Sequence, residues 1–152
     1  MKLSGPLQKL LANRDGKKVV FTNGCFDILH IGHLTYLNEA KALGQILVIG
    51  LNSDASVKRL KGEARPINTQ ENRGYFLHNL KSVDHVEVFD EDTPLQLITE
   101  IAPDILVKGG DWTPDQIVGS EVVLANGGQV KSLSFKDGFS TTQMIQDLQG
   151  KS

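Results

Sequence analysis

The sequence predicts an α/β protein with a doubly wound, mainly parallel sheet of about five strands in a single domain. Short β-branched runs alternate with longer segments of helical periodicity along the chain. This alternation gives right-handed crossovers and places helices on both faces of a parallel sheet. The run from Ile46 to Leu51 is apolar without interruption, which is typical of a strand covered on both faces. The length of 152 residues suits one domain, so we expect a single unit over 1–152 with its core at about 17–149.

Each predicted element has a local signal. The predicted strands cover 18–21, 46–51, 85–89, 105–107 and 130–135. The predicted helices cover 32–43, 69–80, 94–101 and 140–148. The first helix has apolar residues at helical spacing and stops at Gly44, and Thr93 is a suitable N-cap for the third. The stretch 52–68 is polar, and we expect a basic loop within it. This order of elements predicts a Rossmann-like fold.

The composition excludes several classes of protein. Sixteen basic residues stand against eighteen acidic ones, a formal net charge of −2. A balanced chain has no overall field to attract nucleic acid or an anionic membrane, so we expect neither partner, and any anion site must be built locally. The single cysteine, Cys25, excludes an intrachain disulfide framework. No segment resembles a signal peptide or a transmembrane span. We therefore expect a cytoplasmic protein.

Polar residues gather where the first predicted strand ends. Parallel sheets bind ligands beyond the carboxyl ends of their strands, and the first strand runs directly into the segment 23–33. His30 and His33 are three residues apart at a helix start, so their side chains can face one space. Gly32 leaves room for a phosphate to approach backbone N–H groups, and a helix N-terminus favours an anion. Together these residues predict a site for a reacting phosphoryl group.

Other interpretations of the histidine pair stay open. An H-x-x-H pair with Cys25 as a third ligand would be part of a zinc site, although no convincing fourth ligand lies nearby in the sequence. Two ordinary surface histidines at this spacing are a second alternative. The preceding strand and Asp27 favour the phosphate interpretation.

A hydroxyl cluster near the C-terminus is a second candidate for phosphate binding. Ser140, Thr141 and Thr142 open a predicted helix. They can donate hydrogen bonds to a phosphate, or they can form a plain N-terminal cap with Gln143. A second helix N-terminus at the same edge of the sheet favours the phosphate interpretation.

A basic stretch at 58–65 is the third candidate. Its charged residues are Lys58, Arg59, Lys61 and Arg65 against Glu63. Such a run is a solvated loop or, after a strand, a mobile phosphate clamp. Arg73 on the following helix either reaches the same anion or forms a surface ion pair. Neither a G-x-x-x-x-G-K-[ST] loop nor a G-x-G-x-x-G run occurs, so ordinary P-loop and dinucleotide sites lose their main support.

The motif G-C-F-D-x-x-H-x-G-H at 24–33, with the Ser-Thr-Thr run at 140–142, resembles the cytidylyltransferase-like family of nucleotidyltransferases. More narrowly, the stretches 21–30, 52–56, 59–62, 106–111 and 125–128 are similar to the heptose 1-phosphate adenylyltransferases of that family. The similarity extends from about residue 7 to 148. It implies a nucleotidyltransferase domain that transfers AMP from ATP to D-glycero-β-D-manno-heptose 1-phosphate by in-line attack on the α-phosphate. The products are pyrophosphate and ADP-heptose, a precursor of the lipopolysaccharide core.

The resemblance also implies a role for each motif residue. The implied catalytic residues, which contact the ATP phosphates, are His30, His33 and Lys61. The implied nucleotide-binding residues are Asn23, Gly24, Cys25, Phe26, Gly32, Lys108, Gly109, Asp111, Ser140, Thr141 and Thr142. The implied contacts to the acceptor or to phosphate are Asp27, Asn52, Asp54, Arg65 and Arg73. Mg²⁺ is the implied cofactor, bound mainly through the nucleotide phosphates, with no direct protein ligand beyond a contact from Asp27.

Partners and alternatives follow from the same resemblance. It implies a homodimer in a stand-alone form that works with a separate heptose kinase. One alternative is a cytidylyltransferase that acts on glycerol 3-phosphate or another small alcohol phosphate. Its relatives carry an Arg-Thr-x-Gly run where this chain has Phe135-Lys136-Asp137-Gly138, which weakens that alternative. A non-catalytic nucleotide-binding module is the other alternative, and the intact motifs disfavour it.

Overall fold

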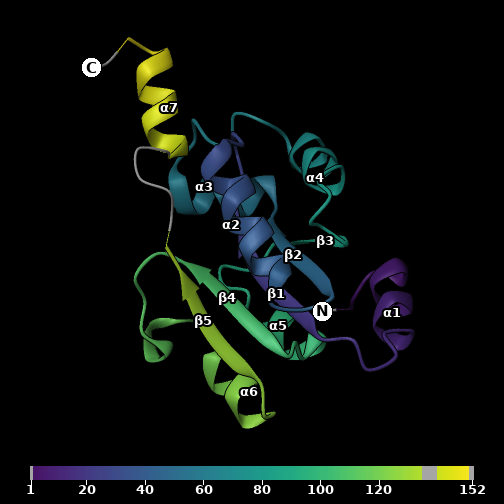
Figure 1. Cartoon of the computed structure of the whole chain (residues 1–152). Coiled ribbons are helices and arrows are strands. Elements are labelled where there is room, and N and C mark those ends of the chain that lie inside the picture. The colour runs from purple at the N-terminus through teal and green to yellow at the C-terminus, as the bar shows by residue number, and fades with distance from the viewer. Residues whose placement is uncertain (1, 135–139, 151–152) are drawn as a thin grey trace.

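The computed structural model describes residues 2–134 and 140–150, which form a five-stranded sheet with helices on both faces (Figure 1). The strands are β1 (Val19–Gly24), β2 (Ile46–Asn52), β3 (His85–Phe89), β4 (Ile105–Gly109) and β5 (Gln129–Leu133). Their order in the sheet is β3-β2-β1-β4-β5, and each neighbouring pair is parallel. The predicted Rossmann-like, doubly wound fold is confirmed.

The helices cover the two faces of the sheet in two groups. In chain order they are α1 (Gly5–Ala12), α2 (Ile31–Ala42), α3 (Asp54–Lys61), α4 (Gln70–His78), α5 (Leu95–Ile101), the 3-10 turn η1 (Pro114–Gln116), α6 (Ser120–Ala125) and α7 (Thr141–Leu148). Buried apolar residues of α2 and α4 pack in one core, and those of α1, α5 and α6 pack in the other. None of the described helices is long and apolar enough to cross a membrane.

Successive side chains of a strand point to opposite faces of the sheet, and this alternation produces two hydrophobic cores, one on each face. In β1, Val19 and Phe21 belong to one core while Val20 belongs to the other, as the period of two along a strand requires. Every residue of β2 is buried, because the central strands of a parallel sheet are covered on both faces. Apolar residues in an unbroken run therefore identified β2 correctly as a buried strand.

Three helices were not predicted. α1 begins after Ser4, whose hydroxyl accepts a hydrogen bond from the Leu7 N–H, and Leu7 is its one buried residue. Leu3, Leu10 and Leu11 pack against the same core as Leu7, and this spacing is that of one helix face, so the signal was present in the sequence and was overlooked. Leu7 is fully buried against the core, so the expected core boundary near residue 17 leaves out a packed helix. α6 is a six-residue helix, which is short for pattern recognition.

The third missed helix, α3, replaces part of the expected basic loop. Ser53 caps it by accepting a hydrogen bond from the Ser56 N–H, and Gly62 ends it with a φ of 102°. Its last turn carries Lys58, Arg59 and Lys61, and cations near a helix C-terminus are stabilised by the helix dipole. The expectation that residues 58–65 form a loop was wrong for residues 58–61, which belong to α3. The helix is short and buries only Ser56 and Val57, so its sequence shows many charged residues and little apolar periodicity.

The sheet order determines where a ligand can bind. The chain first builds β1, β2 and β3 toward one edge and then crosses back to place β4 on the other side of β1. Helices therefore leave β1 and β4 on opposite sides, and a crevice opens between the carboxyl ends of these two strands.

Candidate active site

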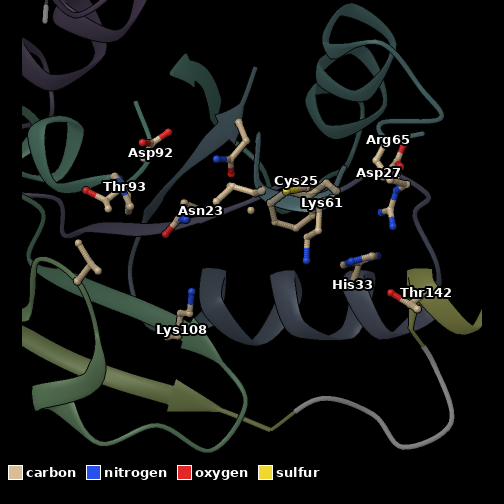
Figure 2. Close-up of a pocket in the computed structure, with 16 residues that line it drawn as sticks. Asn23, Cys25, Asp27, His33, Lys61, Arg65, Asp92, Thr93, Lys108 and Thr142 are labelled. Carbon is tan, nitrogen blue, oxygen red and sulfur yellow. Dashed lines mark hydrogen bonds and ion pairs between the residues drawn. The ribbon is translucent and has the colours of Figure 1, made fainter. Parts of the chain in front are cut away.

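A cavity of about 590 Å³ lies at the carboxyl ends of the strands. Its lining residues are Asn23, Gly24, Cys25, Phe26, Asp27, His33, Asn52, Leu60, Lys61, Arg65, Asp92, Thr93, Pro94, Lys108, Val118 and Thr142. Figure 2 shows Lys61 and Lys108 extending their amines into this space from opposite sides. His33 lies beside Thr142 at one end. Cations and hydroxyl donors that converge from several elements form a site for a polyanion.

A second cavity of about 270 Å³ adjoins the first and shares Asn23, Cys25, Phe26 and Lys108 with it, among others. It is also lined by Tyr36, Gly109 and Trp112. The Trp112 indole Nε1–H donates to the Gly109 carbonyl at 2.8 Å, which orients the ring. The Lys108 amine lies 5.8 Å from the centroid of that ring, within the range of a cation–π contact. Aromatic walls beside a polyanion site suit a planar base next to its phosphates.

The loop after β1 has a constrained backbone. Phe26 has a φ of 46°, which is uncommon for a residue with a Cβ and is concentrated at ligand sites. A Cβ on Gly24 would lie 3.0 Å from Cε2 of the Phe26 ring, so a larger residue would push the ring. Glycine at 24 therefore permits the turn that brings Phe26 into the cavity wall.

The two histidines cap the start of α2 reciprocally. The Gly32 N–H donates to Nδ1 of His30 at 3.1 Å, and the His30 N–H donates to Nδ1 of His33 at 3.3 Å. The ring centroids lie 3.9 Å apart. Because both Nδ1 atoms accept, the proton of each neutral ring is on Nε2. His33 thus presents an N–H donor to the cavity that it lines.

This capping changes one expectation for the helix start. The Gly32 N–H, which we expected to face a phosphate, already donates to His30 within the chain. Gly32 is buried and does not line either cavity. The His33 Nε2–H is therefore the donor at the cavity in place of the Gly32 N–H, whereas His30, also expected to contact the ATP phosphates, lines neither cavity.

Both imidazoles are held neutral. Burial lowers the pKa of His33 to about 4, and the nearby His30 contributes to the same direction. Burial also lowers the pKa of His30. Two adjacent rings with depressed pKa values donate hydrogen bonds at neutral pH without carrying a charge.

We expect His33 to remain neutral in solution from pH 8 down to about pH 5 in the absence of ligand, because its pKa is near 4. An NMR titration of the imidazole nitrogens should show the Nε2–H tautomer over this range. Since the folded-state pKa is below the unfolded value, the associated stability is present above about pH 6.5 and is lost as the pH falls through 4. Titration of His33 near pH 6.5 would contradict the buried, capped geometry.

Asp27 is a buried acceptor for the segment that precedes α4. Its carboxylate accepts from the Arg65 Nε at 2.6 Å and from the N–H groups of Ile67 and Asn68 at 2.9 Å. Burial alone would raise the pKa of Asp27, but the Asn68 and Ile67 N–H groups and Arg65 outweigh it and hold the pKa below its ordinary value. The carboxylate therefore positions Arg65 at the cavity.

Arg73 is fully buried and does not line the cavity. Its guanidinium donates to the carbonyl oxygens of Asn68, Cys25 and Asn52 at 2.7 to 3.0 Å. It also donates to the Asp54 carboxylate at 2.8 Å. The geometry makes Arg73 a connector between the loops that follow β1 and β2. Asp54 belongs to this network and likewise lies outside the cavity lining.

The remaining predicted residues divide into two groups. Lys61, Arg65, Asn52, Lys108 and Thr142 line the main cavity, and Gly109 lines the second. Asp111 lines neither cavity. Ser140 accepts a hydrogen bond from the Gln143 N–H at 3.0 Å and so caps α7. The side chain of Thr141 and the Phe135–Gly138 segment lie outside the described residues.

Cys25 lines both cavities. Burial raises the pKa of the Cys25 thiol above its ordinary value, although Lys61 and two arginines oppose the rise. Within the part of the chain that the structure describes, no three His, Cys, Asp or Glu side chains come together as a metal-binding group.

Sequence reasoning missed several residues of the cavity walls. These are Leu60, Asp92, Thr93, Pro94 and Val118 in the main cavity and Tyr36 and Trp112 in the second. The expectation that Thr93 is the N-cap of this helix was wrong, because α5 begins at Leu95 with Pro94 at the N-cap position and no side-chain cap; the Thr93 hydroxyl lies 3.5 Å from the Leu95 N–H. Asp92 and Thr93 follow β3, so their position after a predicted strand was the available signal.

Comparison with known proteins decides the family. The family described as "Cytidylyltransferase-like" matches residues 21–146. The chain belongs to this family. The prediction of a nucleotidyltransferase is confirmed at this level, and the matched residues include the C-terminal part of β1, the histidine pair and the start of α7.

Curated relatives share more than half of their aligned residues with the chain. The bifunctional protein HldE of Marinomonas sp. (strain MWYL1) is 57% identical over 136 residues, which cover 90% of this chain and 29% of that protein. The bifunctional protein HldE of Haemophilus ducreyi (strain 35000HP) is 58% identical over 138 residues, 91% of this chain and 29% of that protein. The chain thus spans under a third of the length of these relatives.

Two solved structures have a similar fold, one at moderate and one at low sequence identity. The lipopolysaccharide core biosynthesis protein from Thermoplasma volcanium is 32% identical, with a TM-score of 0.63, over 80% of this chain and 98% of that one. Pantothenate synthetase from Thermus thermophilus has a TM-score of 0.64 at 14% identity, over 99% of this chain and 70% of that one. The second similarity concerns the fold alone.

Proposed function

We propose that this domain transfers AMP from ATP to D-glycero-β-D-manno-heptose 1-phosphate and releases pyrophosphate. The observation that carries the proposal is the cavity in which Lys61, Arg65, His33 and Thr142 converge beside a second, aromatic-walled cavity. This arrangement suits a triphosphate, a base and an acceptor phosphate in one continuous space. The sequence similarity to the HldE proteins and to a lipopolysaccharide core biosynthesis protein supports a heptose acceptor.

The reaction needs no nucleophile from the protein. A phosphate oxygen of the sugar 1-phosphate attacks the α-phosphorus of ATP, a new P–O bond forms, and the bond to the β-phosphate oxygen breaks. The electron pair leaves with pyrophosphate. Catalysis then consists of holding the phosphates in line and stabilising charge on the transferred phosphoryl group.

The cationic and imidazole side chains at the cavity have distinct roles in this scheme. His33 donates its Nε2–H to a non-bridging oxygen of the transferred group, and His30 fixes the tautomer and orientation of His33 through the backbone bond. Lys61, the last residue of α3, extends its amine into the cavity (Figure 2) and in this scheme binds the triphosphate. Arg65, which donates a hydrogen bond to the Asp27 carboxylate, binds a phosphate at the end of the cavity where His33 lies. Lys108 lies between this space and the aromatic cavity, where it can bind near the α-phosphate and the nucleoside.

The donor set fits a magnesium ion bound through the nucleotide. Asp27, the carboxylate at the phosphate end, already accepts hydrogen bonds from Arg65, Ile67 and Asn68. We therefore propose that Mg²⁺ is held mainly by the triphosphate oxygens. When bound, it supplies positive charge that neutralises the phosphates and the leaving pyrophosphate.

The cellular setting is part of the proposal. We propose a cytoplasmic homodimer that takes its acceptor from a heptose kinase activity separate from this domain. The acceptor is a sugar 1-phosphate, so a phosphorylating step must precede the reaction.

The experiment that tests this function is pyrophosphate release by the purified protein with Mg²⁺. ATP, CTP, GTP and UTP are each paired with the heptose 1-phosphate and with glycerol 3-phosphate. We expect turnover with ATP and the heptose 1-phosphate alone. Turnover with CTP and glycerol 3-phosphate would overturn the proposal in favour of a cytidylyltransferase. ATP binding without turnover in any pairing would also overturn it.

A further inference from the structure

The main cavity has a second end with a different chemistry. Asp92 and Thr93 line it on the side remote from His33 and Thr142 (Figure 2). Both residues lie between the end of β3 and the start of α5. At the end near His33, the Asp27 carboxylate is already engaged by Arg65 and two backbone N–H groups, which leaves cations and hydrogen-bond donors to face a ligand. The opposite end presents the Asp92 carboxylate and the Thr93 hydroxyl. One cavity therefore has a part suited to phosphate and a part unsuited to it.

Asp92 is held in place by a residue of the basic helix α3. The Arg59 Nε donates to Oδ1 of Asp92 at 3.0 Å. The Arg59 guanidinium also donates to the Asp90 carbonyl oxygen, and the Ser53 hydroxyl donates to the Asp90 carboxylate. These contacts fix the loop that follows β3 against α3. They also explain why Arg59 does not line the cavity although Lys61, two residues later, does.

The other carboxylate oxygen of Asp92 is accessible to a ligand, because the side chain is 75% exposed. Oδ2 accepts no hydrogen bond from the residues that the structure describes, whereas Oδ1 is engaged by Arg59. A carboxylate oxygen accepts hydrogen bonds and cannot donate them when ionised. Its natural partner in a ligand is a hydroxyl group. A fully ionised phosphate has no proton to donate to this carboxylate oxygen.

We propose that Asp92, assisted by Thr93, binds hydroxyl groups of the acceptor sugar and so selects a polyhydroxylated sugar phosphate over a small alcohol phosphate. This inference rests on the proposed function and adds the residues that recognise the acceptor. The sugar phosphate lies with its anionic group toward Lys61 and its hydroxyl-bearing carbons toward the β3–α5 loop. Arg59 is a positioning residue, because it acts on the sugar through Asp92.

The position of the second cavity favours the sugar over the nucleoside as the partner of Asp92. Tyr36, Gly109 and Trp112 line that cavity, and Asp92 and Thr93 do not. A base placed between those aromatic walls puts the nucleotide on the side of β4. The acceptor is then left with the side of β2 and β3, to which Asp92 belongs. The ribose hydroxyls are the competing partner, and the experiment separates the two.

The test measures KM separately for ATP and for the heptose 1-phosphate in the wild-type protein and in Asp92→Ala. We expect KM for the heptose 1-phosphate to rise roughly tenfold and KM for ATP to change less than twofold, since one charge-assisted hydrogen bond is lost only to the sugar. Arg59→Gln should raise the same KM by a smaller factor. Glu100→Gln, an exposed acid on α5 that lines neither cavity, is the charge-matched control.

Acceptor analogues make the assignment specific. The wild-type protein should lose about tenfold in kcat/KM with the monodeoxy heptose 1-phosphate that lacks the contacted hydroxyl. The Asp92→Ala variant should have the same kcat/KM with that analogue and with the parent sugar, because the carboxylate that accepts from the hydroxyl has been removed. A structural role alone would not remove discrimination against one hydroxyl.

The outcomes are distinct from those of the proposed function. Wild-type turnover of the heptose 1-phosphate with an unchanged KM in Asp92→Ala would overturn the inference and leave the proposed function intact. A rise in KM for ATP instead would assign Asp92 to the nucleotide and also overturn it. Absence of wild-type turnover with the heptose 1-phosphate would overturn the proposed function and this inference together.

Discussion

Replacing His33 with alanine should lower kcat by about 100- to 1,000-fold, because a preorganised donor to the reacting phosphoryl group is lost. The His33 Nδ1 is already occupied by the His30 N–H, so its Nε2–H is the group that reaches the cavity. KM for ATP should change much less, since Lys61, Arg65 and Thr142 still bind the phosphates. Pyrophosphate release under saturating substrates measures the effect.

Two controls make the His33 result interpretable. His78→Ala removes a histidine from α4 that lines neither cavity, and we expect near-normal turnover. His33→Gln retains an amide N–H donor and should fall between wild type and alanine. Circular dichroism should confirm that both His33 variants remain folded. Near-wild-type kcat in folded His33→Ala would contradict a role for this imidazole in the transition state.

Replacing Arg73 with alanine should destabilise the fold by about 3–5 kcal/mol, because a buried charge partner and several hydrogen bonds are lost together. The guanidinium is fully buried and serves three carbonyl oxygens and the Asp54 carboxylate. For a chain of this length, the loss corresponds to a fall in Tm of roughly 10 °C. Thermal unfolding followed by circular dichroism measures it.

The Arg73 prediction separates two roles for this residue. Arg73→Lys should be nearly as unstable as the alanine variant, since an ammonium cannot reproduce the fork of donors. Arg14→Ala, which removes a half-exposed ion pair with Asp104, is the matched control and should cost under about 1 kcal/mol. An unchanged Tm in Arg73→Ala together with a raised KM would instead support the direct contact to nucleotide or phosphate that the family resemblance implies.

The sequence predicted the parallel sheet because its signals are local and strong. The uninterrupted apolar run of β2 lies within one element. The signal for α2 was weaker, because Leu37 and Ala40 are buried but Leu34, in the same spacing, is exposed.

The helices α1 and α3, which were not predicted, depend on distant partners for their stability. Ser4 donates to Glu87, 83 residues away, and Arg59 of α3 donates to Asp92 after β3. No window of the sequence contains both partners of such a contact.

The candidate site was predictable to the extent that it resides in motifs. His33, Lys61 and Thr142 were selected by sequence and line the cavity. Arg73 was selected as well, but its charge is directed at backbone carbonyl oxygens rather than into the cavity. Asp92 gave no motif signal, because its importance comes from the crossover that brings the end of β3 beside β2. The sequence predicted which residue types can bind phosphate, but it did not predict whether each side chain points into the cavity or toward the protein interior.

The placement of β1 at the centre of the sheet gives this domain two separable halves. The segments at and after the ends of β2 and β3 supply Asn52, Lys61 and Asp92, whereas those at and after the end of β4 supply Lys108 and Trp112. The end of β1 and the residues that follow it lie between the two and line both cavities. On the proposed assignment of Asp92 to the acceptor, substitutions on the β2–β3 side would change the acceptor and leave the β4 side and the histidine pair unchanged. Grafting the β3–α5 loop between family members should transfer acceptor preference without transferring base preference, a modularity already contained in the order of five strands.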